Sequence, residues 1–130
     1  MANQYYKPEA KASFSIQDFV MTMLHSQTNA HILHLQSRSY AEHKALQSYY
    51  EHIDGLLDDY VEAYQGVYGI IDNYPTTYTK PPKALEYMLS LSIYLMQSRP
   101  SLPIDSELCN ILDEIAALID KTIYKLKFLE

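Results

Sequence analysis

Four runs of apolar residues with helical spacing constrain the fold of this chain most strongly. In each run the apolar side chains recur every three or four positions, which places them on one face of an α-helix. Prolines, glycines and short polar stretches separate the runs, and no alternating pattern bounded by hairpin turns indicates a strand. The pattern therefore predicts an all-α fold, an up-down four-helix bundle with a longer loop between the second and third helices.

One bundle domain is expected over residues 14–130, preceded by a flexible N-terminal arm at 1–13. Ser15 is a candidate N-cap for the first helix, and Asp18 completes the spacing of a capping box. The apolar repeat then continues to about Gln36. A chain of 130 residues is long enough to bury one hydrophobic core without disulfides or a structural metal.

The other three helices are delimited by glycine and proline. The second and longest helix is expected to begin near Ser39 and to end at Gly66 or Gly69. The proline- and threonine-rich segment 73–82 is the predicted long loop. A third helix is predicted over 83–98, and a fourth from about residue 104 to the C-terminus. The inward-facing side chains expected on the third helix are Leu85, Met88, Leu89, Ser92, Leu95 and Met96.

Composition and charge exclude some classes of binding partner. A formal net charge of −6 argues against nucleic acid as the main partner. No apolar run approaches the roughly 18 residues needed to span a bilayer, so no membrane partner is expected. The single cysteine, Cys109, cannot form an intramolecular disulfide, and a cytoplasmic location is expected. Thirteen tyrosines point to half-buried contact surfaces and to an oligomer.

The histidines are concentrated in the first half of the chain, at His25, His31, His34, His43 and His52. His31 and His34 are three residues apart, so they share a helix face. His43 opens the second helix, where Asp58 and Glu62 also share a face. Asp58 lies about 22 Å along the helix axis from His43, at 1.5 Å per residue. These groups can therefore meet only if two subunits pair through antiparallel helices.

Residues 31–66, HILHLQSRSYAEHKALQSYYEHIDGLLDDYVEAYQG, resemble the first two helices of ferritin-like proteins of the Dps type (DNA-binding proteins from starved cells). Those proteins carry a histidine on the first helix, a second histidine opening the next helix, and a DxxxE pair followed by a glycine. Here His43, Asp58 and Glu62 match at the family's spacing. His31 has the family's distance from His43, whereas His34 matches the local context, HLQSRS. The run also resembles uncharacterised ferritin-like proteins of tailed bacteriophages and bacteria.

The resemblance implies a ferritin-like bundle that forms at least a homodimer in the cytoplasm of a bacterium or a phage-infected cell. In Dps-type proteins the matched side chains bind iron across a dimer interface and oxidise it with oxygen or peroxide. Imidazole and carboxylate ligands would also suit Mn(II) or Zn(II). The chain departs from the family at Gln47, where an acidic residue is usual, and it lacks the tryptophan that follows the first histidine.

Two functions therefore stay open. The first is a non-catalytic helical assembly or interaction protein that uses tyrosine-rich faces to self-associate or to bind a host or virion protein; Gln47 favours this interpretation. The alternative is Dps-like iron binding and storage with ferroxidase activity, with metal ligands drawn from His31, His34, His43, Asp58 and Glu62. No phosphate-binding glycine loop, CxxC motif or nucleophile elbow supports another enzyme class.

Overall fold

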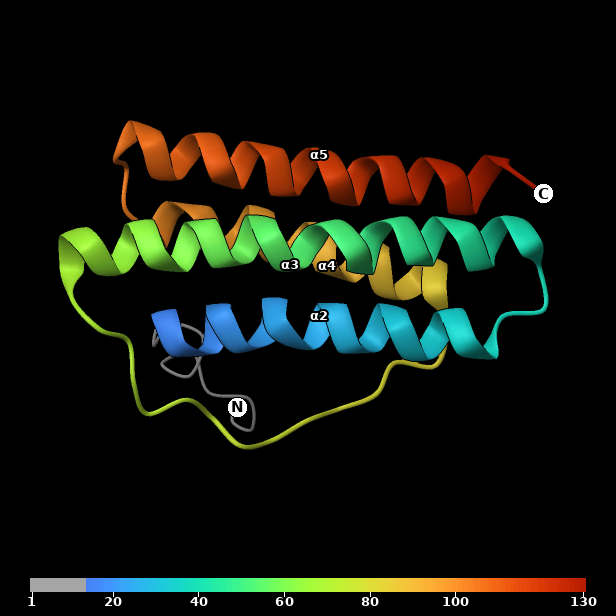
Figure 1. Ribbon diagram of the computed structural model, residues 1–130, viewed down its shortest axis with the longest axis horizontal. Coiled ribbons are helices and arrows are strands. Elements are labelled where there is room, and N and C mark those ends of the chain that lie inside the picture. The colour runs from blue at the N-terminus through green and yellow to red at the C-terminus, as the bar shows by residue number, and fades with distance from the viewer. Residues whose placement is uncertain (1–13) are drawn as a thin grey trace, which may run out of the picture.

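The computed structural model describes residues 14–130; the predicted N-terminal arm lies outside this range. Within it the protein is all-helical, with four α-helices, one short 3-10 turn and no strand (Figure 1). The prediction of an all-α chain with four helices is confirmed. The elements are α2 (Ile16–Gln36), α3 (Tyr40–Tyr68), α4 (Ala84–Ser98), η1 (Arg99–Ser101) and α5 (Ser106–Phe128).

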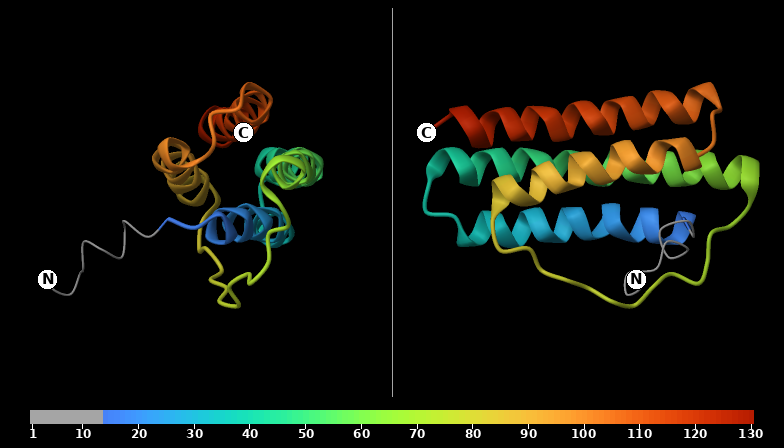
Figure 2. Two further views of the ribbon diagram at one scale, coloured as in Figure 1. Left: turned by 90° about the vertical axis from the view of Figure 1, so that its left-hand side faces the viewer. Right: turned by 180° about the vertical axis from the view of Figure 1, so that it is seen from behind.

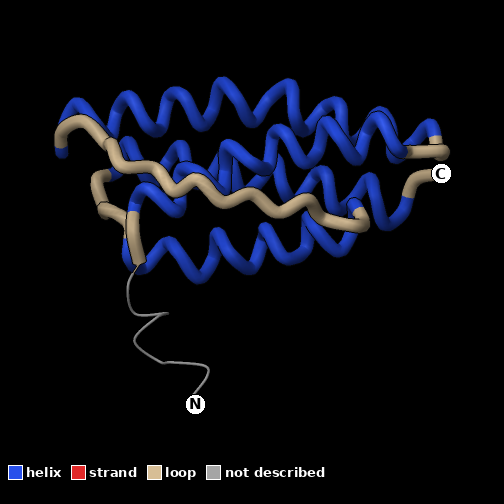
Figure 3. The backbone as a smooth tube through the Cα atoms, turned by 90° about the horizontal axis from the view of Figure 1, so that it is seen from below, coloured by secondary structure: helices blue, strands red, loops and turns tan. Residues whose placement is uncertain are grey.

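The helices form two antiparallel hairpins joined by one long crossover. Residues 37–39 connect α2 to α3, and η1 lies between α4 and α5. Residues 69–83 return along the length of the bundle, so that α3 and α4 run in the same direction (Figures 1 and 3). The simple up-down order expected from the sequence is therefore wrong at this step. Fifteen extended residues reach roughly 50 Å, which exceeds the roughly 44 Å length of α3.

Viewed end-on, the helices follow one another around the bundle in the order α2, α3, α5, α4 (Figure 2). The crossover makes each helix antiparallel to both of its neighbours, an arrangement that the helix dipoles favour. The contacts are unequal, because α3 packs extensively on both α2 and α5, whereas α4 packs mainly on α5 and only sparsely on α2. No helix in the described range is long and apolar enough to cross a membrane.

Two serine N-caps and one glycine C-cap fix helix ends near the predicted bounds, whereas α4 and α5 begin without a side-chain cap. The Ser15 hydroxyl accepts a hydrogen bond from the Asp18 backbone N–H at 3.0 Å, and Ser39 does the same for Glu42 at 3.2 Å. Of the two glycines proposed to end α3, Gly69 is the C-cap, with a φ of 96° that favours glycine. The last helix begins slightly later than predicted, at Ser106.

The inward face of α4 differs from the prediction. Leu89 and Met96 were expected inside but are 40% and 65% exposed. The error arises because apolar residues continue around most of this helix, so hydrophobicity alone does not mark its inner face. The true inner face includes small and polar members; its buried residues are Ala84, Met88, Leu91, Leu95 and Ser98.

A buried asparagine fastens the crossover and α4 to α2. Asn29 is 3% exposed, and its side-chain amide N–H donates to the Tyr87 hydroxyl on α4 at 3.1 Å. Its carbonyl oxygen accepts from the Tyr78 hydroxyl of the crossover, whose ring also packs edge-on against His25. One polar side chain thus bridges three segments, and both of its polar ends are satisfied.

Most described tyrosines belong to the core and not to an outer contact face. Tyr49 and Tyr60 are fully buried. Five others are partly buried and pack against the core: Tyr50, Tyr64, Tyr74, Tyr87 and Tyr94. Only four are largely exposed, and they are spread over the molecule: Tyr40, Tyr68, Tyr78 and Tyr124. Most of the described tyrosines thus contribute to the core of the single chain, and the exposed ones do not gather on one face.

The two fully buried tyrosines differ in how their hydroxyls are satisfied. The Tyr49 hydroxyl lies 2.8 Å from the Ser26 hydroxyl, which itself donates to the Met23 carbonyl. The Tyr60 hydroxyl has no hydrogen-bond partner among residues 14–130. Burial raises the pKa of both phenols, to about 12 for Tyr60.

These two positions form a matched pair for stability measurements. Tyr49→Phe should lower the free energy of unfolding by about 1 kcal/mol, because it removes a buried hydrogen bond and leaves Ser26 short of a donor. Tyr60→Phe should leave that energy unchanged or raise it by up to about 1 kcal/mol, because it removes an unpaired buried hydroxyl. Urea unfolding measures both. Equal losses in the two variants would show that the Tyr60 hydroxyl is satisfied.

Candidate functional site

Two of the predicted metal ligands face each other across the short connection between α2 and α3. The Nδ1 atom of His34 lies 2.8 Å from the His43 carbonyl oxygen, and His43 Nδ1 lies 3.0 Å from the His34 carbonyl oxygen. Their rings stack with centroids 3.6 Å apart and planes 21° apart. We refer to this reciprocal pair as the histidine clasp.

The clasp fixes the tautomer of both rings. A backbone carbonyl only accepts hydrogen bonds, so each Nδ1 must carry the hydrogen, and in the neutral ring Nε2 keeps its lone pair. The His34 carbonyl belongs to the last turn of α2, where carbonyls lack helical partners. It also accepts from the Ser37 backbone N–H at 3.3 Å. The clasp therefore completes the end of α2 and joins it to the start of α3.

The clasp limits how the two imidazoles can bind a metal. Histidines that bind metals usually donate their other ring N–H to a carbonyl or carboxylate, as both do here. However, a ring nitrogen directs its lone pair within the ring plane, and the two planes are nearly parallel. Because these lone pairs do not converge, His34 and His43 can each offer one ligand but cannot chelate one ion together in this arrangement.

The third histidine predicted as a ligand, His31, lies next to the clasp. His31 is exposed, and its ring stacks on Tyr50 with centroids 4.2 Å apart. His34 packs edge-on against the same tyrosine at 5.2 Å. Thus His31, His34 and His43 lie together at one end of the α2–α3 hairpin, with Tyr50 between the helices.

The predicted carboxylate ligands lie elsewhere. Asp58 and Glu62 are exposed on α3, about four turns from His43. A hydrogen bond with Asp58, together with the neighbouring charge, raises the pKa of the Glu62 carboxyl. In residues 14–130 no group of three or more His, Cys, Asp or Glu side chains is placed to hold a metal ion. The structure gathers the three histidines but does not bring them to the carboxylates.

Gln47, which stands where the Dps pattern has an acid, is hydrogen-bonded to two other side chains on the surface of α3. Its amide nitrogen donates to Glu51 at 3.0 Å, and its oxygen accepts from the Lys44 ammonium at 3.3 Å. A neutral side chain therefore occupies the position where the family has an acid, and it already has local partners.

A second candidate site, not predicted from the sequence, is an apolar surface formed by α4 and α5. Three residues of α4 at helical spacing, Leu89, Ile93 and Met96, are at least 40% exposed. On α5, Tyr124 and Phe128 are also more than half exposed, and their rings lie 5.9 Å apart. We call these five residues the α4–α5 face. Its signal in the sequence is that α4 contains one charged residue, Glu86, in 15 positions.

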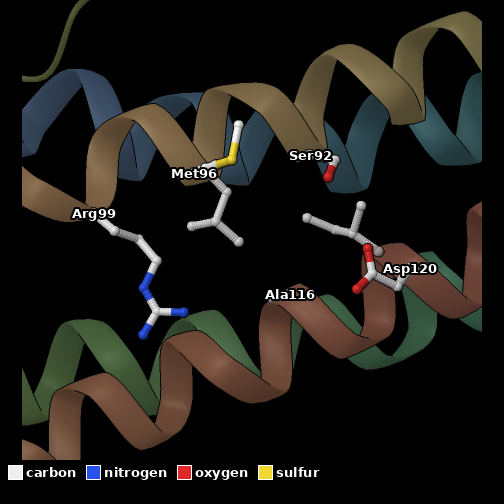
Figure 4. Close-up of a pocket in the computed structure, with 7 residues that line it drawn as sticks. Ser92, Met96, Arg99, Ala116 and Asp120 are labelled. Carbon is white, nitrogen blue, oxygen red and sulfur yellow. The ribbon is translucent and has the colours of Figure 1, made fainter.

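A hollow of about 200 Å³ lies between the two helices of this face (Figure 4). Its lining is mostly apolar and includes Leu95, Ala116 and Ile119, whereas Ser92 and Asp120 add polar groups at one end. In Figure 4, α4 contributes Ser92 and Met96 to the lining, and α5 contributes Ala116 and Asp120.

Charged groups mark the other end of the hollow. Arg99 lines it and forms an ion pair with Asp113 at 2.9 Å. It also donates to the Cys109 carbonyl at 3.4 Å. The face thus combines an apolar centre with charged ends, the composition of many protein contact surfaces.

Removing the clasp should destabilise the fold. His34→Ala should lower the free energy of unfolding by about 1–3 kcal/mol, because it removes a buried ring, a hydrogen bond and a partner of His43. The control is His52→Ala, since His52 is exposed and bonds only to the Ser48 carbonyl of its own helix; its cost should stay below about 0.5 kcal/mol. Thermal and urea unfolding measure both, and equal costs would contradict a structural role for the clasp.

Sequence comparison assigns most of both candidate sites to one protein family. No curated protein and no solved structure matches the chain. Residues 34–126 match a described family of unknown function, DUF5856, and this region contains the clasp, the crossover, all of α4 and most of α5. The chain belongs to this family of unknown function.

Proposed function

We propose that the protein is a non-catalytic interaction and assembly protein whose working surface is the α4–α5 face. The observation that carries this proposal is the exposed apolar stripe of Leu89, Ile93 and Met96 on a helix with one charged residue. Apolar contact flanked by charged groups is the chemistry of protein recognition. The function proposed is therefore binding of a protein surface and not turnover of a substrate.

The energetic argument concerns exposed apolar area. Fully burying an exposed isoleucine is worth roughly 1.5–3 kcal/mol, so covering the half of Ile93 that is exposed would contribute about half of that. Contiguous apolar patches on soluble proteins often mark contact sites, and helices that are apolar around most of their circumference are usually covered. The α4 helix fits that description but packs mainly on α5.

The connectivity supports a ferritin-like bundle as the framework for this function. Ferritin-like folds contain two helical hairpins joined by one long crossover. Residues 69–83 make such a crossover, fastened to α2 through Asn29. We therefore extend the proposal to a ferritin-like bundle that forms a homo-oligomer or binds a host or virion protein.

The working surface can be tested independently of the partner's identity. Tagged chains would be recovered from cells that naturally make the protein and that also contain untagged copies. Polypeptides that co-purify with the wild type should be lost with Ile93→Asp. They should remain with Leu35→Asp, a matched change at a 71% exposed leucine on α2. Identical co-purifying polypeptides with wild type and Ile93→Asp would contradict the proposal.

A second candidate function is divalent-metal binding at a site shared by two copies. Two observations favour it: the clasp leaves each Nε2 atom free to bind, and Asp58 and Glu62 lie one turn apart on α3, close enough that Asp58 raises the pKa of the Glu62 carboxyl. Paired antiparallel hairpins would bring His31, His34 or His43 of one copy to the carboxylates of the other. Each histidine would supply one ligand, and Fe(II), Mn(II) or Zn(II) would suit this donor set.

Metal binding would be tested by anaerobic titration with Fe(II), followed by oxygen or peroxide while Fe(III)-oxo absorbance is recorded. Binding should be lost with Asp58→Ala and with His43→Ala, and retained with His52→Ala. Zn(II) titration by calorimetry gives a readout that needs no redox step. Absence of binding by the wild type, or binding unaffected by Asp58→Ala, would eliminate this candidate.

A further inference from the structure

We infer that the occupant of the α4–α5 face is a second copy of this chain, with α4 of each copy packed against α5 of the other. This inference rests on the proposed function, because it names the partner of the same surface. The two-fold axis would run along the groove between α4 and α5. The four helices at the contact would then form a second bundle in which neighbouring helices are antiparallel.

Charge complementarity favours a second copy. At one end of the face Arg99 is paired with Asp113. Because α4 and α5 are antiparallel, Glu86 and Lys127 both lie about 20 Å away at the other end, at 1.5 Å per residue. The proposed axis brings Arg99 of one copy to the level of Asp113 of the second, and Glu86 to that of Lys127. At each end of the face, the cation of one copy therefore lies opposite the anion of the other. A two-fold contact requires such a self-complementary pattern.

The apolar residues are self-complementary in the same register. Ser92 and Asp120 line the same hollow, so Leu89 lies near the level of Tyr124. Packing α4 against the second copy's α5 would cover Leu89 with Tyr124. It would also place Met96, 65% exposed at the rim of the hollow, opposite the small Ala116. Methionine is flexible enough to fill an irregular hollow of this kind.

The surrounding charges do not oppose this arrangement. A two-fold axis that crossed the helices near the middle of α4, at the level of Ser92, would place Asp120 of one copy opposite Asp120 of the other, which is unfavourable. The axis along the groove avoids that contact. It places Asp120 at the level of Ser92, whose hydroxyl can donate a hydrogen bond to the carboxylate. The charges therefore favour the two-fold axis along the groove over the axis across the helices.

Sedimentation equilibrium of the full chain tests the inference over roughly micromolar to submillimolar concentrations. The wild type should show a monomer–dimer equilibrium. Ile93→Asp should raise Kd at least tenfold, with Leu35→Asp as the control. Glu86→Lys should raise Kd several-fold, and adding Lys127→Glu in the same chain should restore it, because the reversed pair re-forms between copies. Circular dichroism would verify that each variant is folded.

Cross-linking tests the register. In a Cys109→Ala background, a chain with Leu89→Cys would be mixed with a tagged chain carrying Tyr124→Cys and oxidised. Disulfide-linked heterodimers should form efficiently, whereas a mixture of Leu35→Cys with Tyr124→Cys should not link. A monomer at all concentrations, a Kd unaffected by Ile93→Asp, or absence of the heterodimer would overturn the inference. If Ile93→Asp instead abolished binding of a different protein, the proposed function would stand and only the inference of a second copy would fail. If Ile93→Asp changed no contact of any kind, both proposals would be rejected.

Discussion

The crossover between α3 and α4 is the constraint on which the rest of the structure depends. Because residues 69–83 span the bundle, α4 starts at the end opposite to where α3 stops and becomes antiparallel to both α2 and α5. Asn29 holds this path through the Tyr78 and Tyr87 hydroxyls. The α4 helix is nevertheless short and packs mainly on α5. Its position therefore leaves an apolar surface uncovered, and that surface is the basis of the proposed function.

Much of the fold could be predicted from local rules. Apolar periodicity identified the four helices, and the Ser15, Ser39 and Gly69 caps follow from side-chain hydrogen bonding and backbone conformation. The direction of α4 could not be predicted, because it depends on the path of the crossover and not on any helix. Its inner face was mispredicted for a different reason: with Leu89, Ile93 and Met96 added to its core residues, apolar side chains cover most of α4, and only a narrow polar strip of Glu86, Ser90 and Gln97 marks the outside.

For the candidate metal ligands, the sequence predicted the positions along each helix but not the contacts between helices. Spacing predicted that His31 and His34 share a face and that Asp58 lies far from His43 along one helix. It could not predict the clasp, because the hydrogen bonds between His34 and His43 depend on the turn that joins their helices. The clasp explains the two histidines through the stability of the hairpin, whether or not a metal binds. The clasp thus accounts for His34 and His43, two residues that the Dps resemblance alone would assign to iron binding.

Amide hydrogen exchange of the full chain, compared well below and well above the concentration at which it associates, tests the central claim most directly. Exchange reports local opening and burial along the backbone. If the α4–α5 face is the working surface, added protection at high concentration should appear in residues 84–98 and in the second half of α5. The exchange rates of the exposed amides in α2 and α3 should not change with concentration. Protection confined to residues 31–62 would contradict the account and would instead favour pairing through the histidine and carboxylate hairpin.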